Sequence, residues 1–131
     1  MVVKRHVGRR HAPAQPGERA DLQHAGLVAL EAQPRLGLGA ENKLLRFVQS
    51  GARALTVSWI RFQDGLKLDL ARLGKACKER DVAFIVDGIQ GAGTALPDLT
   101  NVSAFATGGH KGLLAPQGVG LLWTRPDFRR Q

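Results

Sequence analysis

The sequence predicts an α/β fold with a mainly parallel β-sheet. Four short segments rich in apolar and β-branched residues, at about 54–60, 82–87, 103–107 and 119–124, have the length and composition of buried strands. A helical segment, 69–80, separates the first two. Strands joined by a helix normally lie parallel in one sheet, so this order favours parallel pairing.

A first helix is predicted just before the first strand. Leu44, Leu45 and Val48 supply its apolar face. We expect it to end near Gly51, because glycine commonly follows a helix C-terminus.

The helix at 69–80 has both a start signal and an apolar face. Asp69 is a good N-cap residue. Leu70, Leu73 and Cys77 follow at the spacing of one helix face. Cys77 is the only cysteine, so no internal disulfide can form and a reducing cytoplasm is compatible. Its position predicts a small buried hydrophobe rather than a catalytic nucleophile.

The chain divides near residue 40. Residues 1–40 form a poorly defined basic segment rich in Pro, Gly and Arg, in which Pro13, Pro16 and Pro34 interrupt any long helix. A short helix between Asp21 and Gln33 is the only element that the pattern indicates there. Residues 41–131 hold the predicted strands and helices.

Composition limits the classes of function. The 131 residues carry a formal charge of +8, which could retain the chain on polyanions or make it a basic interaction module. Tyr is absent and aromatic residues make up only 5%, so we expect no base-stacking platform and no specific nucleic-acid binding. No apolar run reaches the roughly 20 residues that span a bilayer, and no secretory signal is expected.

An acid and an amine follow two of the predicted strands. Asp87 closes the strand at 82–87 and Lys111 follows the strand at 103–107, so both should reach the edge of the sheet where ligands bind in open α/β folds. A lysine that forms an imine, together with a carboxylate beside a pyridine nitrogen, is what a protein contributes to pyridoxal-phosphate chemistry. Spacing alone also allows a solvated surface pair.

The sequence around these residues resembles the class V aminotransferase family, which includes cysteine desulfurases and isopenicillin-N-epimerase-like proteins. The resemblance rests on two sequence motifs, Val86-Asp87-Gly88-Ile89-Gln90 and the stretch 109–123, which begins Gly109-His110-Lys111. The resemblance spans about residues 44–126. It implies part of the large domain of a fold-type-I pyridoxal-phosphate enzyme, a three-layer α/β sandwich that normally forms a homodimer and acts on an amino acid.

The resemblance also implies roles for individual residues. Asp87 would pair with the pyridine nitrogen of pyridoxal 5'-phosphate, and Gln90 would contact its ring hydroxyl. His110 would lie near the phosphate. Lys111 would bind the cofactor as an imine and then move protons as the catalytic residue.

Several positions depart from the family pattern. Gly108 stands where many members have a serine that contacts the phosphate, and neighbouring Thr107 would point to the opposite side of the strand. Gly112 replaces a bulky residue after the lysine, and Ala115-Pro116 replaces Gly-Pro. Phe62 stands where desulfurases usually have Asn, which favours the epimerase-like branch.

Alternative functions stay open. The chain could be a fragment of an epimerase-, lyase- or transaminase-type enzyme, a truncated non-catalytic remnant, or the basic interaction module. The glycine-rich stretch 88–93 does not match the G-x-G-x-x-G dinucleotide fingerprint. His6, His11 and His24 lack partners at metal-ligand spacing, so no metal site is predicted.

Overall fold

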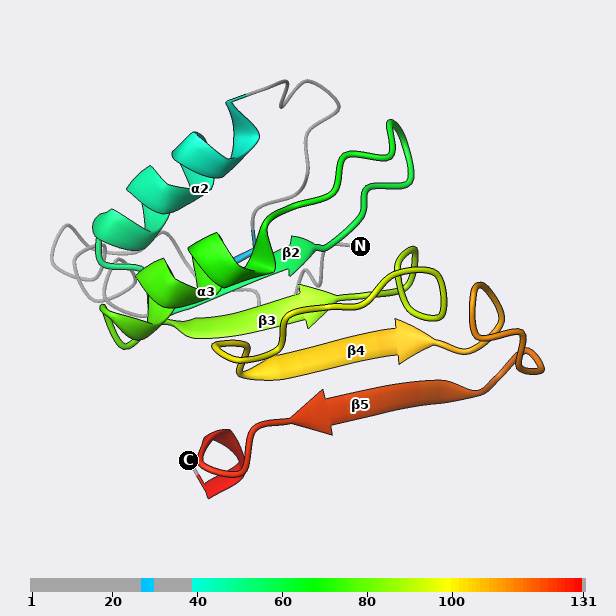
Figure 1. Cartoon of the computed structure of the whole chain (residues 1–131). Helices are drawn as coiled ribbons and strands as arrows, with labels where there is room; N and C mark the ends of the chain where they lie inside the picture. The colour runs from blue at the N-terminus through cyan, green and yellow to red at the C-terminus, as the bar shows by residue number, and fades with distance from the viewer. Residues whose placement is uncertain (1–26, 30–38, 131) are drawn as a thin grey trace, which may run out of the picture.

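The computed structural model describes residues 27–29 and 39–130, with side chains described for 39–129. These residues form one five-stranded sheet with two α-helices and a final 3₁₀ turn (Figure 1). In chain order the elements are β1 (Leu27–Ala29), α2 (Ala40–Gln49), β2 (Ala54–Ser58), α3 (Leu70–Lys78), β3 (Ala83–Asp87), β4 (Ala104–Gly108), β5 (Gly120–Thr124) and η1 (Phe128–Arg130).

The sheet follows the order of the chain, β1-β2-β3-β4-β5. Strands β1 to β4 are parallel to one another, and β5 is antiparallel to β4. This confirms the predicted α/β class with a mainly parallel sheet. The carboxyl ends of β2, β3 and β4 therefore meet at one edge of the sheet (Figure 1).

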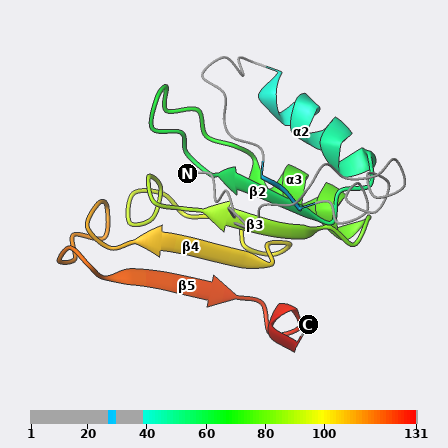
Figure 2. The same ribbon diagram turned by 180° about the vertical axis from the view of Figure 1, so that it is seen from behind.

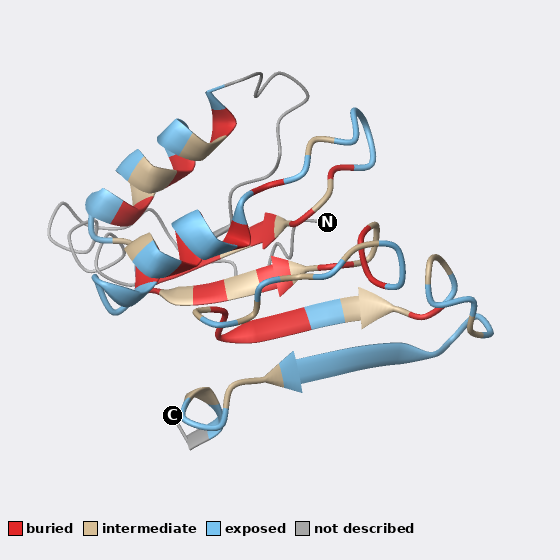
Figure 3. Ribbon diagram, viewed as in Figure 1, coloured by how far each residue is buried: buried red, intermediate tan, exposed pale blue. Residues whose placement is uncertain are grey.

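Both helices lie on the same face of the sheet, as opposite views show (Figures 1 and 2). Helix α2 buries Ala40, Leu44 and Val48, and α3 buries Leu70, Leu73, Gly74 and Cys77. Strands β2 and β3 contribute the fully buried side chains of Leu55, Phe84 and Val86. The described residues thus form two layers, with the apolar core between them (Figure 3).

A polar cluster joins α2 to the start of α3. The Asp69 carboxylate caps α3 by accepting the N–H of Arg72 at 2.9 Å. The two Glu41 carboxylate oxygens accept the Asp69 N–H at 2.8 Å and the Arg72 guanidinium at 2.9 Å. Arg72 also donates to Asn42 at 2.9 Å. Arg72 is exposed, and its contacts tie the two helices together.

One prediction in the N-terminal segment is wrong. Residues Leu27–Ala29, inside the short helix expected from Asp21 to Gln33, form β1 and pair with Ala54–Thr56. A weak helical pattern over so few residues yields to pairing along the free edge of β2. The rest of that expected helix, and most of residues 1–40, lie outside the described residues.

Strand β5 is exposed on both faces. Leu121, Leu122 and Trp123 are 59%, 71% and 39% exposed, and β4 is its only described neighbour (Figure 3). Neither helix of the described part of the chain is long and apolar enough to cross a membrane.

Candidate active site

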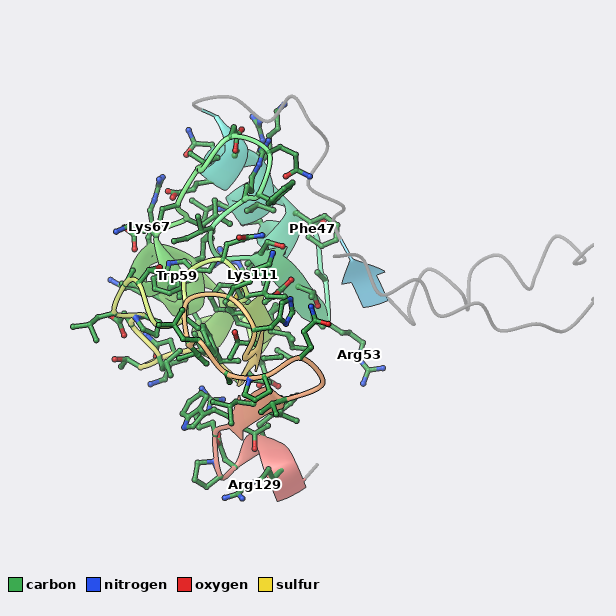
Figure 4. All side chains as sticks on the ribbon, turned by 90° about the vertical axis from the view of Figure 1, so that its right-hand side faces the viewer. Phe47, Arg53, Trp59, Lys67, Lys111 and Arg129 are labelled. Carbon is green, nitrogen blue, oxygen red and sulfur yellow. The ribbon has the colours of Figure 1, made fainter. Side chains whose placement is uncertain are left out.

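The candidate site lies at the carboxyl edge of the parallel strands. Asp87 is the last residue of β3, and Lys111 lies in the loop 109–119 that follows β4. Because β3 and β4 are parallel neighbours, the acid and the loop that carries the amine reach the same edge. Figure 4 looks onto this edge and shows Lys111 near its centre.

Asp87 belongs to the sheet face that the helices leave uncovered. Its register partners are Ser58 on β2 and Ala106 on β4, so these three residues share one face. One Asp87 carboxylate oxygen accepts the backbone N–H of Ile89 at 3.0 Å, which orients the half-buried side chain. The neighbours in the row are small, and Ala106 is exposed, so the surface beside the carboxylate stays open.

The turn after β3 packs closely against two aromatic rings. A Cβ on Gly88 would overlap the ring of Phe105, and a Cβ on Gly91 would overlap Trp59. The two rings meet edge to face at 6.2 Å between centroids. These glycines therefore serve packing. Gln90 lies in this turn, half-buried, one residue before Gly91.

Backbone hydrogen bonds fix the loop that carries Lys111. The Gly109 N–H donates to the Val119 carbonyl at 2.8 Å, and the Ala115 N–H donates to the Gly109 carbonyl at 2.9 Å. The Leu114 N–H closes a tight turn on the Lys111 carbonyl at 2.9 Å. His110 is exposed and directly precedes this turn. The loop is therefore held on both sides of the lysine.

The Lys111 amine lies over an aromatic ring from another loop. Its Nζ is 5.4 Å from the centroid of the Phe62 ring, a cation–π distance. Phe62 is 78% exposed and follows β2 in the segment 60–67. Sequence reasoning noted Phe62 only as a departure from a pattern and missed this contact, because nothing local pairs two residues so far apart in the chain.

A second contact joins the loops after β3 and β4. A Cβ on Gly112 would overlap the Ala92 carbonyl oxygen, and a Cβ on Gly93 would overlap the Gly112 carbonyl. Close backbone approach explains why a glycine can stand directly after Lys111 in this chain. It also couples the turn that follows Asp87 to the loop that carries the amine.

The residues present fit pyridoxal 5'-phosphate in part. A carboxylate, an amine and an open row of small residues suit a planar pyridine ring with an aldehyde. A hydroxyl for the phosphate is missing at Gly108. Thr107 does not replace it, because it faces the helix side of β4 and its hydroxyl donates to the Gly108 carbonyl at 3.1 Å.

The remaining candidates are a nucleophile, a metal site and a cavity. Cys77 is fully buried in α3, as predicted, and burial raises the pKa of its thiol to about 11. Among the described residues, no three His, Cys, Asp or Glu side chains gather as a metal site would require. A cavity of about 330 Å³ lies elsewhere, beside the start of α3, between Trp59, Lys67 and Leu96.

The aminotransferase class-V family pattern matches residues 11–131. The match begins well upstream of the motifs around Asp87 and Lys111. A probable cysteine desulfurase of Pyrococcus abyssi is 32% identical over 91 residues, which cover 68% of this chain and 21% of that protein. Isopenicillin N epimerase of Amycolatopsis lactamdurans is 34% identical over 115 residues, covering 80% and 28%.

Solved structures show the same fold. The apo cysteine desulfurase of Thermococcus onnurineus superposes with a TM-score of 0.65 at 27% identity, covering 75% of this chain and 24% of that one. Ureidoglycine-glyoxylate aminotransferase of Bacillus subtilis gives 0.64 at 20% identity, covering 68% and 24%. The chain thus spans about a quarter of the length of the proteins it matches.

Proposed function

Because the chain belongs to the aminotransferase class-V family, we propose that it binds pyridoxal 5'-phosphate at the carboxyl edge of its sheet. The reaction served by the whole protein would take place at the α-carbon of an amino acid. The observation that carries this proposal is the delivery of Asp87 and Lys111 to one edge by neighbouring parallel strands. That edge is the usual ligand site of open α/β sheets.

Each site residue has a role that its chemistry allows. Lys111 would hold the cofactor through its primary amine, and the same amine would move a proton at the substrate α-carbon. Asp87 would hold a proton on the pyridine nitrogen, and its anchored carboxylate suits that task. Gln90 would donate to the ring hydroxyl, and His110 would approach the phosphate. When bound, the cofactor supplies an electron sink for the bond broken at the α-carbon.

The type of reaction is epimerisation, elimination or transamination. The relatives include cysteine desulfurases and an isopenicillin N epimerase. Phe62, in place of the Asn usual in desulfurases, supports the epimerase-like branch. We further propose a homodimer and a cytoplasmic location for the whole protein, in keeping with a single buried cysteine.

Trapping of the cofactor tests this proposal. Pyridoxal 5'-phosphate added to the purified chain should give an absorbance band near the edge of the visible range, and borohydride should fix the label. Peptide mapping should place that label on Lys111, and Lys111→Ala should lose it. Lys67→Ala, which removes an exposed lysine at the same end of the molecule, is the matched control. A label distributed over several lysines would refute the site.

A non-catalytic role is the second candidate. Gly108 brings no hydroxyl to the phosphate, and β5 presents apolar side chains on both faces. A chain with these features could bind the cofactor weakly, or only associate with a partner. A screen for racemase, lyase and transaminase turnover tests the catalytic role. We expect the 131 residues alone to turn over little or nothing, because they span about a quarter of the matched proteins. Turnover dependent on pyridoxal 5'-phosphate would therefore exclude the non-catalytic role.

A further inference from the structure

Phe62 presents its ring to solvent and to one amine. The ring is 78% exposed, although burial of an aromatic side chain normally contributes to stability. The Lys111 Nζ lies over this ring, 5.4 Å from its centroid. The pairing joins the segment after β2 to the loop after β4, across the edge where Asp87 ends β3.

The segment that carries Phe62 is well braced. Ile60 and Lys67 pair as an antiparallel bridge, and the Leu68 N–H donates to the Trp59 carbonyl at 2.9 Å. Between them the Arg61 N–H donates to the Leu66 carbonyl at 3.0 Å.

An ion pair closes the tip of the same hairpin. The Arg61 guanidinium, 3% exposed, lies 2.8 Å from the Asp64 carboxylate. The Gly65 N–H donates back to the Arg61 carbonyl at 3.0 Å. Phe62 follows this buried anchor directly, so the hairpin fixes the backbone from which its ring projects.

The opposite side of the contact is equally fixed. Backbone bonds at Gly109 and Leu114 hold the loop around Lys111, and Gly112 locks it against Ala92. Two rigid segments therefore bring a ring face and an ammonium together. A lysine side chain has four rotatable bonds, so without such a contact the amine would sample a wide volume of solvent.

We propose that Phe62 is a positioning residue for Lys111: its ring face holds the protonated amine at the carboxyl edge of the sheet until a carbonyl ligand takes it. The inference rests on the proposed function for the importance of Lys111, but its test needs no cofactor. An aromatic face is required rather than any apolar side chain, because the attraction comes from the ring quadrupole.

The test measures how fast individual lysines react. The full chain is treated with a limiting amine-acylating reagent, and mass spectrometry gives the rate at Lys111, with exposed Lys67 and Lys75 as internal references. Phe62 is replaced by Leu, by Tyr, and by pentafluorophenylalanine, which keeps the shape of the ring and reverses its quadrupole. Leu96→Ala is the matched control, because Leu96 is 97% exposed and lines the cavity beside α3.

The expected result is selective. Phe62→Leu and the pentafluoro ring should each raise the rate at Lys111 about two- to five-fold relative to the reference lysines, the size of an exposed cation–π contact. Phe62→Tyr and Leu96→Ala should leave it at the parent value. Equal Lys111 rates in the parent and the pentafluoro variant, or an equal rise at all three lysines, would overturn the inference.

The outcome is separable from that of the proposed function. A ring effect on Lys111 acylation in a chain that never traps pyridoxal 5'-phosphate would leave this inference standing while the cofactor proposal fails. Trapping of pyridoxal 5'-phosphate on Lys111 without any ring effect would support the cofactor proposal and overturn this inference.

Discussion

Gly93 and Gly112 meet back to back, so that a side chain on either one would overlap the backbone near the other. Gly93 also has a left-handed φ of 83° that disfavours any other residue. The contact joins the turn that begins at Asp87 to the loop that holds Lys111. The two groups of the candidate site are thus linked through backbone as well as through the sheet.

Because of this contact, we expect Gly112→Ala to destabilise the fold. The new methyl would overlap the Ala92 carbonyl, a backbone atom that cannot move aside cheaply. We expect the free energy of unfolding, measured with urea, to fall by about 1–3 kcal/mol. Gly39→Ala is the control, since its Cβ meets nothing within 4 Å, and should change stability by less than about 1 kcal/mol. Equal stability of the two variants would contradict the contact.

The sequence predicted those features that depend on local signals. Asp69 caps α3, and Leu70, Leu73 and Cys77 face the core, because capping and helical spacing are read within one turn. The strand at 83–87 ends at Asp87 as expected.

Local sequence signals could not predict contacts between residues far apart in the chain. The antiparallel direction of β5 depends on how a loop turns, and the Phe62–Lys111 contact joins residues in loops that follow different strands. The three residues of β1 carry too short a pattern to distinguish strand from helix, so their pairing with β2 decided the matter.

Replacing Asp87 tests the electron-sink role. Asp87→Asn should still allow borohydride trapping on Lys111, but cofactor retention should weaken about ten- to a hundred-fold, because a hydrogen bond between charged groups contributes about 1.5–3 kcal/mol. Exchange of the α-proton of a bound amino acid, followed by NMR in deuterated water, should fall as well. The control is Asp98→Asn, an exposed carboxylate in the segment between β3 and β4. Retention equal to that of the parent would refute the role.

Because Cys77 is buried, we expect the folded chain to lose stability at alkaline pH. Burial raises the pKa of its thiol from 9.0 to about 11, so the folded chain keeps the proton that the unfolded chain releases. The thiol therefore does not lower the free energy of unfolding below pH 9. As the pH rises toward 11, that free energy falls by up to about 3 kcal/mol. Urea unfolding of the parent and of Cys77→Ala across this range measures the difference. Identical pH profiles, or rapid reaction of the native thiol with a disulfide reagent at pH 8, would contradict it.

Strand β5 predicts self-association of the 131-residue chain. Leu122 is 71% exposed on the face shared with Asp87, and Leu121 and Trp123 are exposed on the other. Within the described residues the outer edge of β5 has no partner strand, and such apolar edges promote association. Sedimentation should show species larger than a monomer, and Leu122→Lys should shift the distribution toward monomer by placing a charge on the edge strand. Leu96→Lys adds the same charge at a residue 97% exposed but outside any strand, so it should have less effect. A parent chain that stays monomeric at high concentration would show that the exposed faces of β5 are tolerated in water.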